Sequence, residues 1–169
     1  AASYTMAIAQ QLYEGLPIGD EGSVGLITYM RTDSTRVARS AIVETREFIS
    51  SKYGSQFVPP HARSFITSTK AAQEAHEAIR PTKIRREPSL FKPYLTADQF
   101  KLYKLIWKRM VASQMSPASF DNTAVDIKVQ DKIQKMEYLF RTSSSVSRFP
   151  GFTILYTESK DEADKEGKK

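Results

Sequence analysis

The spacing of apolar residues changes at Pro117, and this change limits the folds that the chain can adopt. Before Pro117, apolar side chains recur every three or four residues, which is the period of a helix with one buried face. After Pro117, apolar and polar residues alternate in short runs, which is the period of a strand. Helices grouped ahead of strands, rather than alternating with them, predict an α+β fold.

Two segments near the start of the chain have the pattern of a helix. Residues 3–13 place apolar side chains at helical spacing, and Gly15 suits the end of such a helix. Residues 39–53 follow the same pattern and are followed by Gly54. Between them, residues 25–30 form an apolar run with β-branched and aromatic side chains, bounded by glycine and a polar turn. This run predicts a short buried strand.

Residues 96–115 have the clearest helical pattern in the chain. Thr96 and Gln99 are spaced for a capping box, and the apolar residues that follow, Trp107 among them, form one stripe that we expect to be buried. Three lysines share another face of this helix: Lys101, Lys104 and Lys108. That face either follows a phosphate backbone or is simply solvated, and the second arrangement is the commoner.

Three runs beyond Pro117 have the alternation of a strand: residues 123–129, 137–142 and 152–157. The short polar connections between them predict antiparallel hairpins. The residues that follow are mostly charged, which predicts a disordered tail. The expected domains are a helical domain over 1–117, a β-rich part over 118–157 and a charged disordered tail over 158–169.

The amino-acid composition excludes several classes of function. The chain has no cysteine, which excludes disulfides, thiolate metal sites and a cysteine nucleophile. Its two histidines, His61 and His76, are far apart in the sequence, so we expect no histidine-rich metal site. No apolar stretch approaches about 18 residues, and the first residues lack the pattern of a signal peptide. We therefore expect a cytoplasmic protein that does not enter a membrane.

The net charge of +6 is unevenly distributed. The tail, residues 158–169, carries four lysines and five acidic residues, which leaves a net charge of +7 on the rest of the chain. A folded body with this excess attracts polyanions, nucleic acid first. Charge alone does not select nucleic acid, because many basic domains bind none.

A first candidate for chemistry lies where the short strand is predicted to end, in residues 28–34 (TYMRTDS). Side chains alternate along an extended segment, so Tyr29 and Arg31 project to one side and Met30 to the other. A phenol is a weak nucleophile until positive charge favours its phenolate, and an arginine can hold a phosphate oxygen as negative charge develops. The pair suits phosphoryl transfer, although a packed tyrosine beside a surface arginine is the commoner meaning of this spacing.

A second candidate lies in residues 71–79, which consist of good helix formers and are followed by Pro81. His76 and Arg80 are four residues apart, so on a helix they share one face, where both can donate hydrogen bonds to a phosphate. The alternative is that both side chains cap the last carbonyls of the helix. The chain has no glycine-rich phosphate loop and no HExxH motif.

Four motifs resemble, in their order and spacing, those of the type IA DNA topoisomerases: residues 25–34 (GLITYMRTDS), 72–82 (AQEAHEAIRPT), 105–109 (LIWKR) and 114–117 (QMSP). The resemblance runs over residues 3–157. The first motif favours the bacterial topoisomerase I branch over topoisomerase III and reverse gyrase. One departure is Ala38-Arg39-Ser40, where the family often has a Ser-Asp-Glu-like helix start. Losing that capping box costs about 1 kcal/mol of local helix stability.

The resemblance implies that Tyr29 attacks a DNA phosphodiester and becomes linked to the 5′ phosphate, without ATP. It implies that Arg31 positions the scissile phosphate and that His76 binds or orients the DNA. Arg80 is expected to have a structural or DNA-contacting role, and we also expect Arg36 to contact DNA. The activity implied is the relaxation of negatively supercoiled DNA through a single-strand break, strand passage and religation.

The family's Toprim domain, with its acidic Mg²⁺ cluster, has no counterpart in the chain. The resemblance therefore implies a piece of a larger enzyme: the helical tyrosine domain and part of a β-rich gate or hinge domain. We expect Mg²⁺ to bind the absent Toprim domain, no metal to bind this piece, and the piece alone to be inactive. The expected partners are single-stranded or negatively supercoiled DNA, in the nucleoid, and the rest of the parent enzyme.

Two further expectations follow. The alternative function is a non-catalytic clamp that holds single-stranded DNA while chemistry occurs elsewhere. The strands are also expected to lack some of their native neighbours, and exposed strand edges invite pairing. We therefore expect the isolated chain to self-associate.

Overall fold

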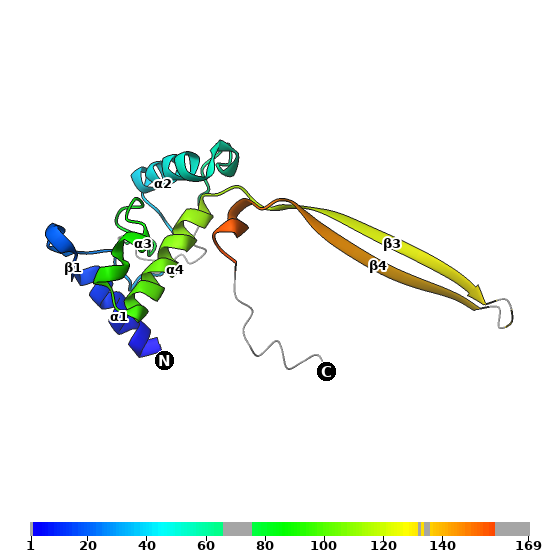
Figure 1. Ribbon diagram of the computed structural model, residues 1–169, viewed down its shortest axis with the longest axis horizontal. Coiled ribbons are helices and arrows are strands. Elements are labelled where there is room, and N and C mark those ends of the chain that lie inside the picture. The colour runs from blue at the N-terminus through cyan, green and yellow to red at the C-terminus, as the bar shows by residue number, and fades with distance from the viewer. Residues whose placement is uncertain (1, 66–75, 132, 134–135, 158–169) are drawn as a thin grey trace.

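The structure, a computed structural model, consists of a helical body and a long two-stranded ribbon that projects from it (Figure 1). It describes residues 2–65, 76–131, 133 and 136–157. The charged tail therefore lies outside the described residues. The mixture of helices and antiparallel strands confirms the predicted α+β class.

The described α-helices are α1 (Ala2–Glu14), α2 (Arg39–Tyr53), α3 (Pro88–Phe91) and α4 (Ala97–Ser113). Short 3₁₀ turns cover Gly19–Glu21, Ser55–Phe57, Lys92–Tyr94 and Gly151–Ile154. The three helices predicted over 3–13, 39–53 and 96–115 are confirmed as α1, α2 and α4. The capping box is confirmed too, because Thr96 Oγ1 accepts from the Gln99 N–H at 3.3 Å and Gln99 Oε1 accepts from the Thr96 N–H at 2.9 Å.

The core of the body forms where α1, α2 and α4 bring their apolar faces together. Trp107 is buried, as predicted, and its Nε1–H donates to the Ile84 carbonyl at 2.8 Å. Tyr103 is also buried and donates to the Arg86 carbonyl at 2.6 Å. These bonds satisfy the polar ends of two large aromatic side chains, which would otherwise be costly to bury.

The strand predicted over residues 25–30 is reduced to a single bridge between Ile27 and Pro81. Leu26 and Ile27 are buried as predicted, and the Thr28 N–H donates to the Arg80 carbonyl at 2.9 Å. The pairing stays short because the Arg80 N–H donates to the Thr28 hydroxyl and the Leu26 N–H donates to the Leu12 carbonyl, so neither extends the ladder.

The helix predicted over residues 71–79 is wrong for the part that is described. Residues 71–75 lie outside the described residues, and residues 76–80 are not helical. Their backbone groups bond across the fold instead, since the Ala78 N–H donates to the Arg36 carbonyl at 2.7 Å. Good helix propensity is a weak preference that such tertiary hydrogen bonds override.

The described strands are β1 (Leu16–Pro17), β2 (Ser23–Val24), β3 (Ser119–Asp131) and β4 (Met136–Phe149). β1 pairs with β2, and β3 pairs with β4, both antiparallel. The hairpin predicted from residues 123–129 and 137–142 is therefore confirmed, and its strands extend beyond the predicted ranges. One face of this ribbon is apolar and exposed: Val125, Ile127, Val129, Tyr138 and Phe140.

The third predicted strand, over residues 152–157, is wrong. The segment begins with the 3₁₀ turn Gly151–Ile154, which returns to the body beside the end of α4. Its Phe152 N–H donates to the Ser116 carbonyl at 3.0 Å, so the segment docks on the body and does not add a strand. Gly151 has a φ of 50°, and a Cβ there would lie 2.4 Å from the Pro117 carbonyl carbon, so only glycine fits this turn.

Candidate active site around Tyr29

Tyr29 lies at the edge of the core, with its ring between two other rings. The ring of Tyr13, near the end of α1, meets it edge-on with centroids 5.4 Å apart. The ring of His76 lies 4.9 Å away at a tilt of 39°. The adjacent residue, Met30, is only 5% exposed, whereas Tyr29 is half-buried, and the backbone bends at Thr28 and at Met30.

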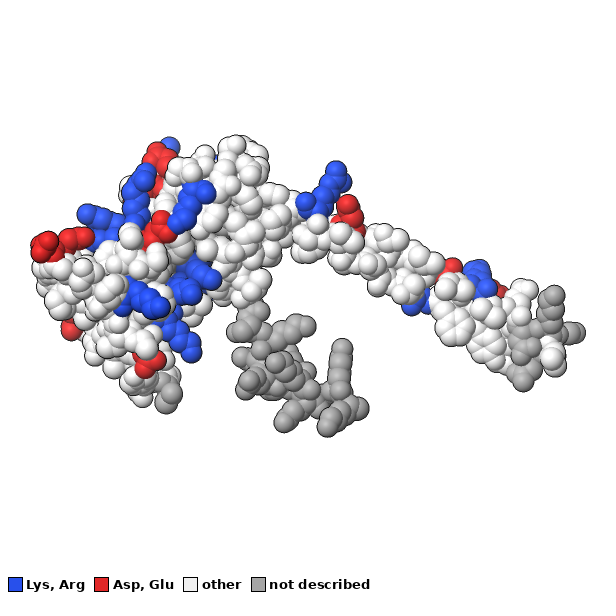
Figure 2. Space-filling model, viewed as in Figure 1, with Lys and Arg blue, Asp and Glu red and all other residues white. Residues whose placement is uncertain are grey.

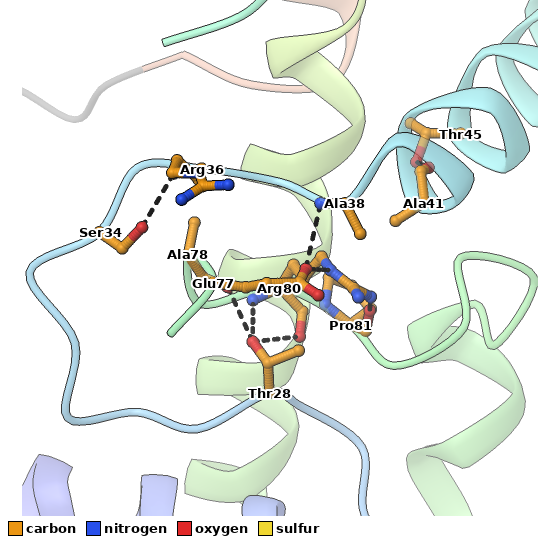
Figure 3. Close-up of polar contacts among 10 residues, drawn as sticks. All are labelled: Thr28, Ser34, Arg36, Ala38, Ala41, Thr45, Glu77, Ala78, Arg80 and Pro81. Carbon is orange, nitrogen blue, oxygen red and sulfur yellow. Dashed lines mark hydrogen bonds and ion pairs between the residues drawn. The ribbon is translucent and has the colours of Figure 1, made fainter. Parts of the chain in front are cut away.

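Thr28 fixes the segment that carries the histidine (Figure 3). Its hydroxyl accepts a hydrogen bond from the Arg80 N–H at 2.9 Å and donates one to the Ala78 carbonyl at 2.8 Å. Because Thr28 precedes Tyr29 directly, these bonds hold residues 78–80 beside the tyrosine. His76 reaches the Tyr29 ring from this segment.

Glu77 ties the same segment to the start of α2 (Figure 3). Its carboxylate accepts from Arg80 Nε at 2.7 Å and from the Ala38 N–H at 3.2 Å. The hydrogen bond from Arg80 lowers the pKa of the Glu77 carboxyl. Ala38 has no capping side chain, so Glu77 serves the N–H that a local capping box would serve.

Arg80 is engaged inside the chain. Its side chain is 13% exposed, and besides Glu77 it donates from Nη1 to the Pro81 carbonyl at 3.0 Å. His76 is exposed. The expectation that His76 and Arg80 share one face of a helix is therefore wrong, because residues 76–80 form no helical turn.

Arg31 and Arg36 are both exposed, on the polar loop that follows Tyr29. The loop is held by local bonds, in which the Ser34 N–H donates to Thr32 Oγ1 and the Arg36 N–H donates to Ser34 Oγ. In the part of the chain that the structure describes, neither arginine forms an ion pair, and Arg31 makes no cation–π contact with the Tyr29 ring. Figure 2 shows lysine and arginine side chains spread over the helical body.

The described residues were not found to gather metal-binding side chains. Among them, no three His, Cys, Asp or Glu side chains lie close enough to hold a metal ion. In the same ranges, no helix is long and apolar enough to cross a membrane.

Sequence reasoning did not single out Thr28, Glu77 or Tyr13. The hydrogen-bond partners of Thr28 are 50 and 52 residues away, so no local sequence pattern could predict these contacts. Glu77 carried a weak signal, because it stands three residues before Arg80, a spacing typical of ion pairs on a helix. The observed pair forms on a non-helical segment instead.

Three comparisons place the chain among known proteins. A family model described as DNA topoisomerase matches residues 1–169. DNA topoisomerase 1 of Xylella fastidiosa, in strains Temecula1 / ATCC 700964 and 9a5c, is 46% identical over 98% of this chain. The full-length topoisomerase I of Thermotoga maritima is similar over 94% of the chain, with a TM-score of 0.73 and 38% identity. The chain spans 20% of the length of the Xylella proteins and 24% of the Thermotoga chain.

Proposed function

Because the chain belongs to the DNA topoisomerase family and is a piece of a type IA enzyme, we propose that Tyr29 is the nucleophile with which the parent enzyme cuts one DNA strand. The observation that carries the proposal is the position of the phenol. Tyr29 is half-buried against His76, while Met30 takes the place in the core. A tyrosine held rigidly at the surface can meet a phosphate without local unfolding.

In the proposed step, Tyr29 Oη forms a bond to the phosphorus of a DNA phosphodiester. The bond between that phosphorus and the 3′ oxygen breaks, and the phenol proton ends on the 3′ oxygen. The products are a free 3′ hydroxyl and a 5′ phosphate esterified to Tyr29. One phosphate ester replaces another, so the reverse step rejoins the strand and no ATP is consumed. Passage of a second strand between the two steps relaxes negatively supercoiled DNA.

The surrounding cations have distinct proposed roles. Arg31, two residues after the nucleophile, stabilises the negative charge that develops on the phosphate oxygens. His76, in ring contact with Tyr29, orients the DNA beside it. Arg80 acts structurally, since its guanidinium bonds to Glu77 and Pro81.

The rest of the parent enzyme supplies what this piece lacks. We place the Mg²⁺ site and its acidic ligands in a Toprim domain outside the chain, as the resemblance to the family implies, and the chain spans only 20% of the length of the Xylella relatives. The piece alone is then inactive in cleavage, and its natural setting is the chromosomal DNA of the cytoplasm.

A second function has one observation in its favour. Arg31 and Arg36 are exposed and form no ion pair within the described ranges, which suits a clamp that holds single-stranded DNA without reacting. The clamp and the nucleophile differ in what Tyr29 does, so a substitution there separates them.

The test is Tyr29→Phe in the full-length parent enzyme, incubated with Mg²⁺ and an end-labelled single-stranded oligonucleotide and then denatured. We expect the labelled covalent adduct to disappear. Tyr94→Phe is the matched control, since Tyr94 is an exposed tyrosine outside the site, and the adduct should persist. An adduct that persists in the Tyr29 variant contradicts the proposal and favours the clamp.

A further inference from the structure

A cavity of about 220 Å³ lies between the loop that holds Arg36 and the segment that holds Arg63. Thr35 and Ser64 also line it, and Phe65 forms part of its wall. This volume is below the roughly 300–1,000 Å³ of pockets that enclose drug-sized ligands. The cavity suits one small polar group and not a whole nucleotide.

The charged residues that line the cavity are all positive. Arg36 and Arg63 line it together with the apolar Val37 and Ile42, and none of its lining residues is acidic. Neither Arg36 nor Arg63 forms an ion pair within the ranges that the structure describes. Two arginines beside the Ser64 hydroxyl, with no carboxylate among the lining residues, form a site for an anion that accepts several hydrogen bonds.

Both walls of the cavity are fixed by hydrogen bonds to the protein interior. Gln114, only 1% exposed, donates from Nε2 to the Arg63 carbonyl at 3.0 Å, and its Oε1 accepts from the Arg63 N–H at 3.2 Å. On the other wall, the Arg36 carbonyl accepts from the Ala78 N–H at 2.7 Å. The two walls are joined where Thr35 Oγ1 donates to the Phe65 carbonyl at 3.1 Å. The arginine backbones are therefore held in place before a ligand arrives.

We propose that this cavity, the Arg36–Arg63 cavity, binds one backbone phosphate of single-stranded DNA while an adjacent base stacks on Phe65. The choice of DNA as the ligand rests on the function proposed above. Phe65 is 48% exposed beside the two arginines, so its ring can receive a base. Only an unpaired base presents its face to such a ring, which selects single-stranded over double-stranded DNA.

The cavity is joined to the Tyr29 site by one short segment. Ala78 bonds both to Arg36 and to Thr28, which precedes the tyrosine. A phosphate in the cavity is thus held by the loop that leads away from Tyr29, and it anchors the strand at a second point besides the scissile phosphate.

The test measures the binding of a fluorescein-labelled oligothymidylate to the full-length parent enzyme over a range of salt concentrations. The variants are Arg36→Gln, Arg63→Gln and both together. Loss of one phosphate contact on a single strand flattens the plot of log affinity against log salt by about 0.7. We expect the double variant to show this single loss, because both arginines hold the same phosphate. A loss near 1.4, which is about twice that value, means two separate phosphates and overturns the shared site.

Arg148→Gln is the charge-matched control. Arg148 lies on β4, its side chain is 76% exposed, and the variant should keep the parent slope. An unchanged slope in the double variant, or an equal change in the control, overturns the proposal. Phe65→Leu should weaken the binding of oligothymidylate but not of an abasic strand of equal length, and an equal loss for both strands overturns the stacking.

These measurements are independent of the role of Tyr29. Equilibrium binding does not depend on which residue attacks the phosphate. If Tyr29→Phe still forms the adduct while the double variant flattens the slope, the proposed nucleophile fails and the cavity stands. If the adduct disappears while the slope stays unchanged, the cavity fails and the nucleophile stands.

Discussion

The Arg80 N–H donates a hydrogen bond to the Thr28 hydroxyl at 2.9 Å, across 52 residues of sequence. The same hydroxyl donates to the Ala78 carbonyl at 2.8 Å. Thr28 precedes Tyr29, and Ala78 lies two residues after His76. One hydroxyl group therefore helps to set how the tyrosine and histidine rings meet.

Thr28→Val removes both hydrogen bonds while keeping the shape of the side chain. We expect adduct formation in the parent enzyme to slow by about tenfold, which corresponds to about 1.4 kcal/mol. Thr28→Ser, which restores the hydroxyl, should recover most of the rate. Single-turnover kinetics with an end-labelled oligonucleotide measure both.

Thr82→Val is the matched control for that change. Thr82 Oγ1 donates to the Gly25 carbonyl at 2.8 Å, in the same pairing of segments but without a bond to residues 78–80. This variant should lose stability, by about 1 kcal/mol, and keep the rate of adduct formation. Equal slowing in both valine variants means that the pairing as a whole, and not the Thr28 hydroxyl, positions His76.

Glu77→Gln should change how stability depends on pH. Arg80 lowers the pKa of Glu77 from its usual 4.5, so the folded state favours the ionised carboxylate. The stabilisation is complete above the unfolded pKa and is lost as the pH falls through the lower folded pKa. The difference in unfolding free energy between the unmodified chain and the Gln variant should therefore be largest above about pH 5 and shrink as the pH falls through the lowered folded pKa.

Urea denaturation at a series of pH values, followed by Trp107 fluorescence, measures this difference. Trp107 is the single tryptophan of the chain and is buried in the body. Glu47→Gln is the control, since Glu47 is exposed on α2 and has no ion pair among the described residues. A Glu77 difference that grows as the pH falls is the opposite of the expected trend.

Gln114→Leu should destabilise the body by about 2 kcal/mol. The substitution leaves the Arg63 N–H and carbonyl without the amide that satisfies them, and unpaired backbone groups are costly to bury. The midpoint of urea denaturation by Trp107 fluorescence measures the loss. Gln56→Leu, at an exposed glutamine, should change stability by less than about 0.5 kcal/mol. Similar losses in both variants argue against a special role for Gln114.

The isolated chain should self-associate through the ribbon of β3 and β4. Ile127 and Phe140 lie opposite each other on its apolar face, 50% and 59% exposed, and exposed patches of this kind favour association. Ile127→Thr with Phe140→Thr should shift the chain to monomer in a light-scattering concentration series. Leu139→Thr changes an equally exposed residue on the opposite face and should leave the association in place. If the isolated chain without substitutions is monomeric at every concentration, the prediction is wrong.

The sequence predicted the elements whose stability depends on near neighbours. The helices α1, α2 and α4 follow from apolar side chains three or four residues apart, and the β3–β4 hairpin follows from alternation along two adjacent runs. Met30 is buried and Tyr29 is half-buried, as the expected alternation predicts, although the backbone bends at Thr28 and Met30. The sequence alone therefore indicated residues 28–34 as a candidate site.

Contacts between distant segments decided the rest. Residues 152–157 have the composition of a strand, but the Phe152 N–H bonds to the Ser116 carbonyl, and the segment turns back onto α4. Residues 76–79 have the composition of a helix, but Thr28 and Arg36 take their backbone hydrogen bonds. Local propensity amounts to a few tenths of a kcal/mol per residue, whereas each tertiary hydrogen bond contributes about 1 kcal/mol. The sequence alone thus determined which tyrosine to examine, and the tertiary structure decided that His76, 47 positions away, would meet it.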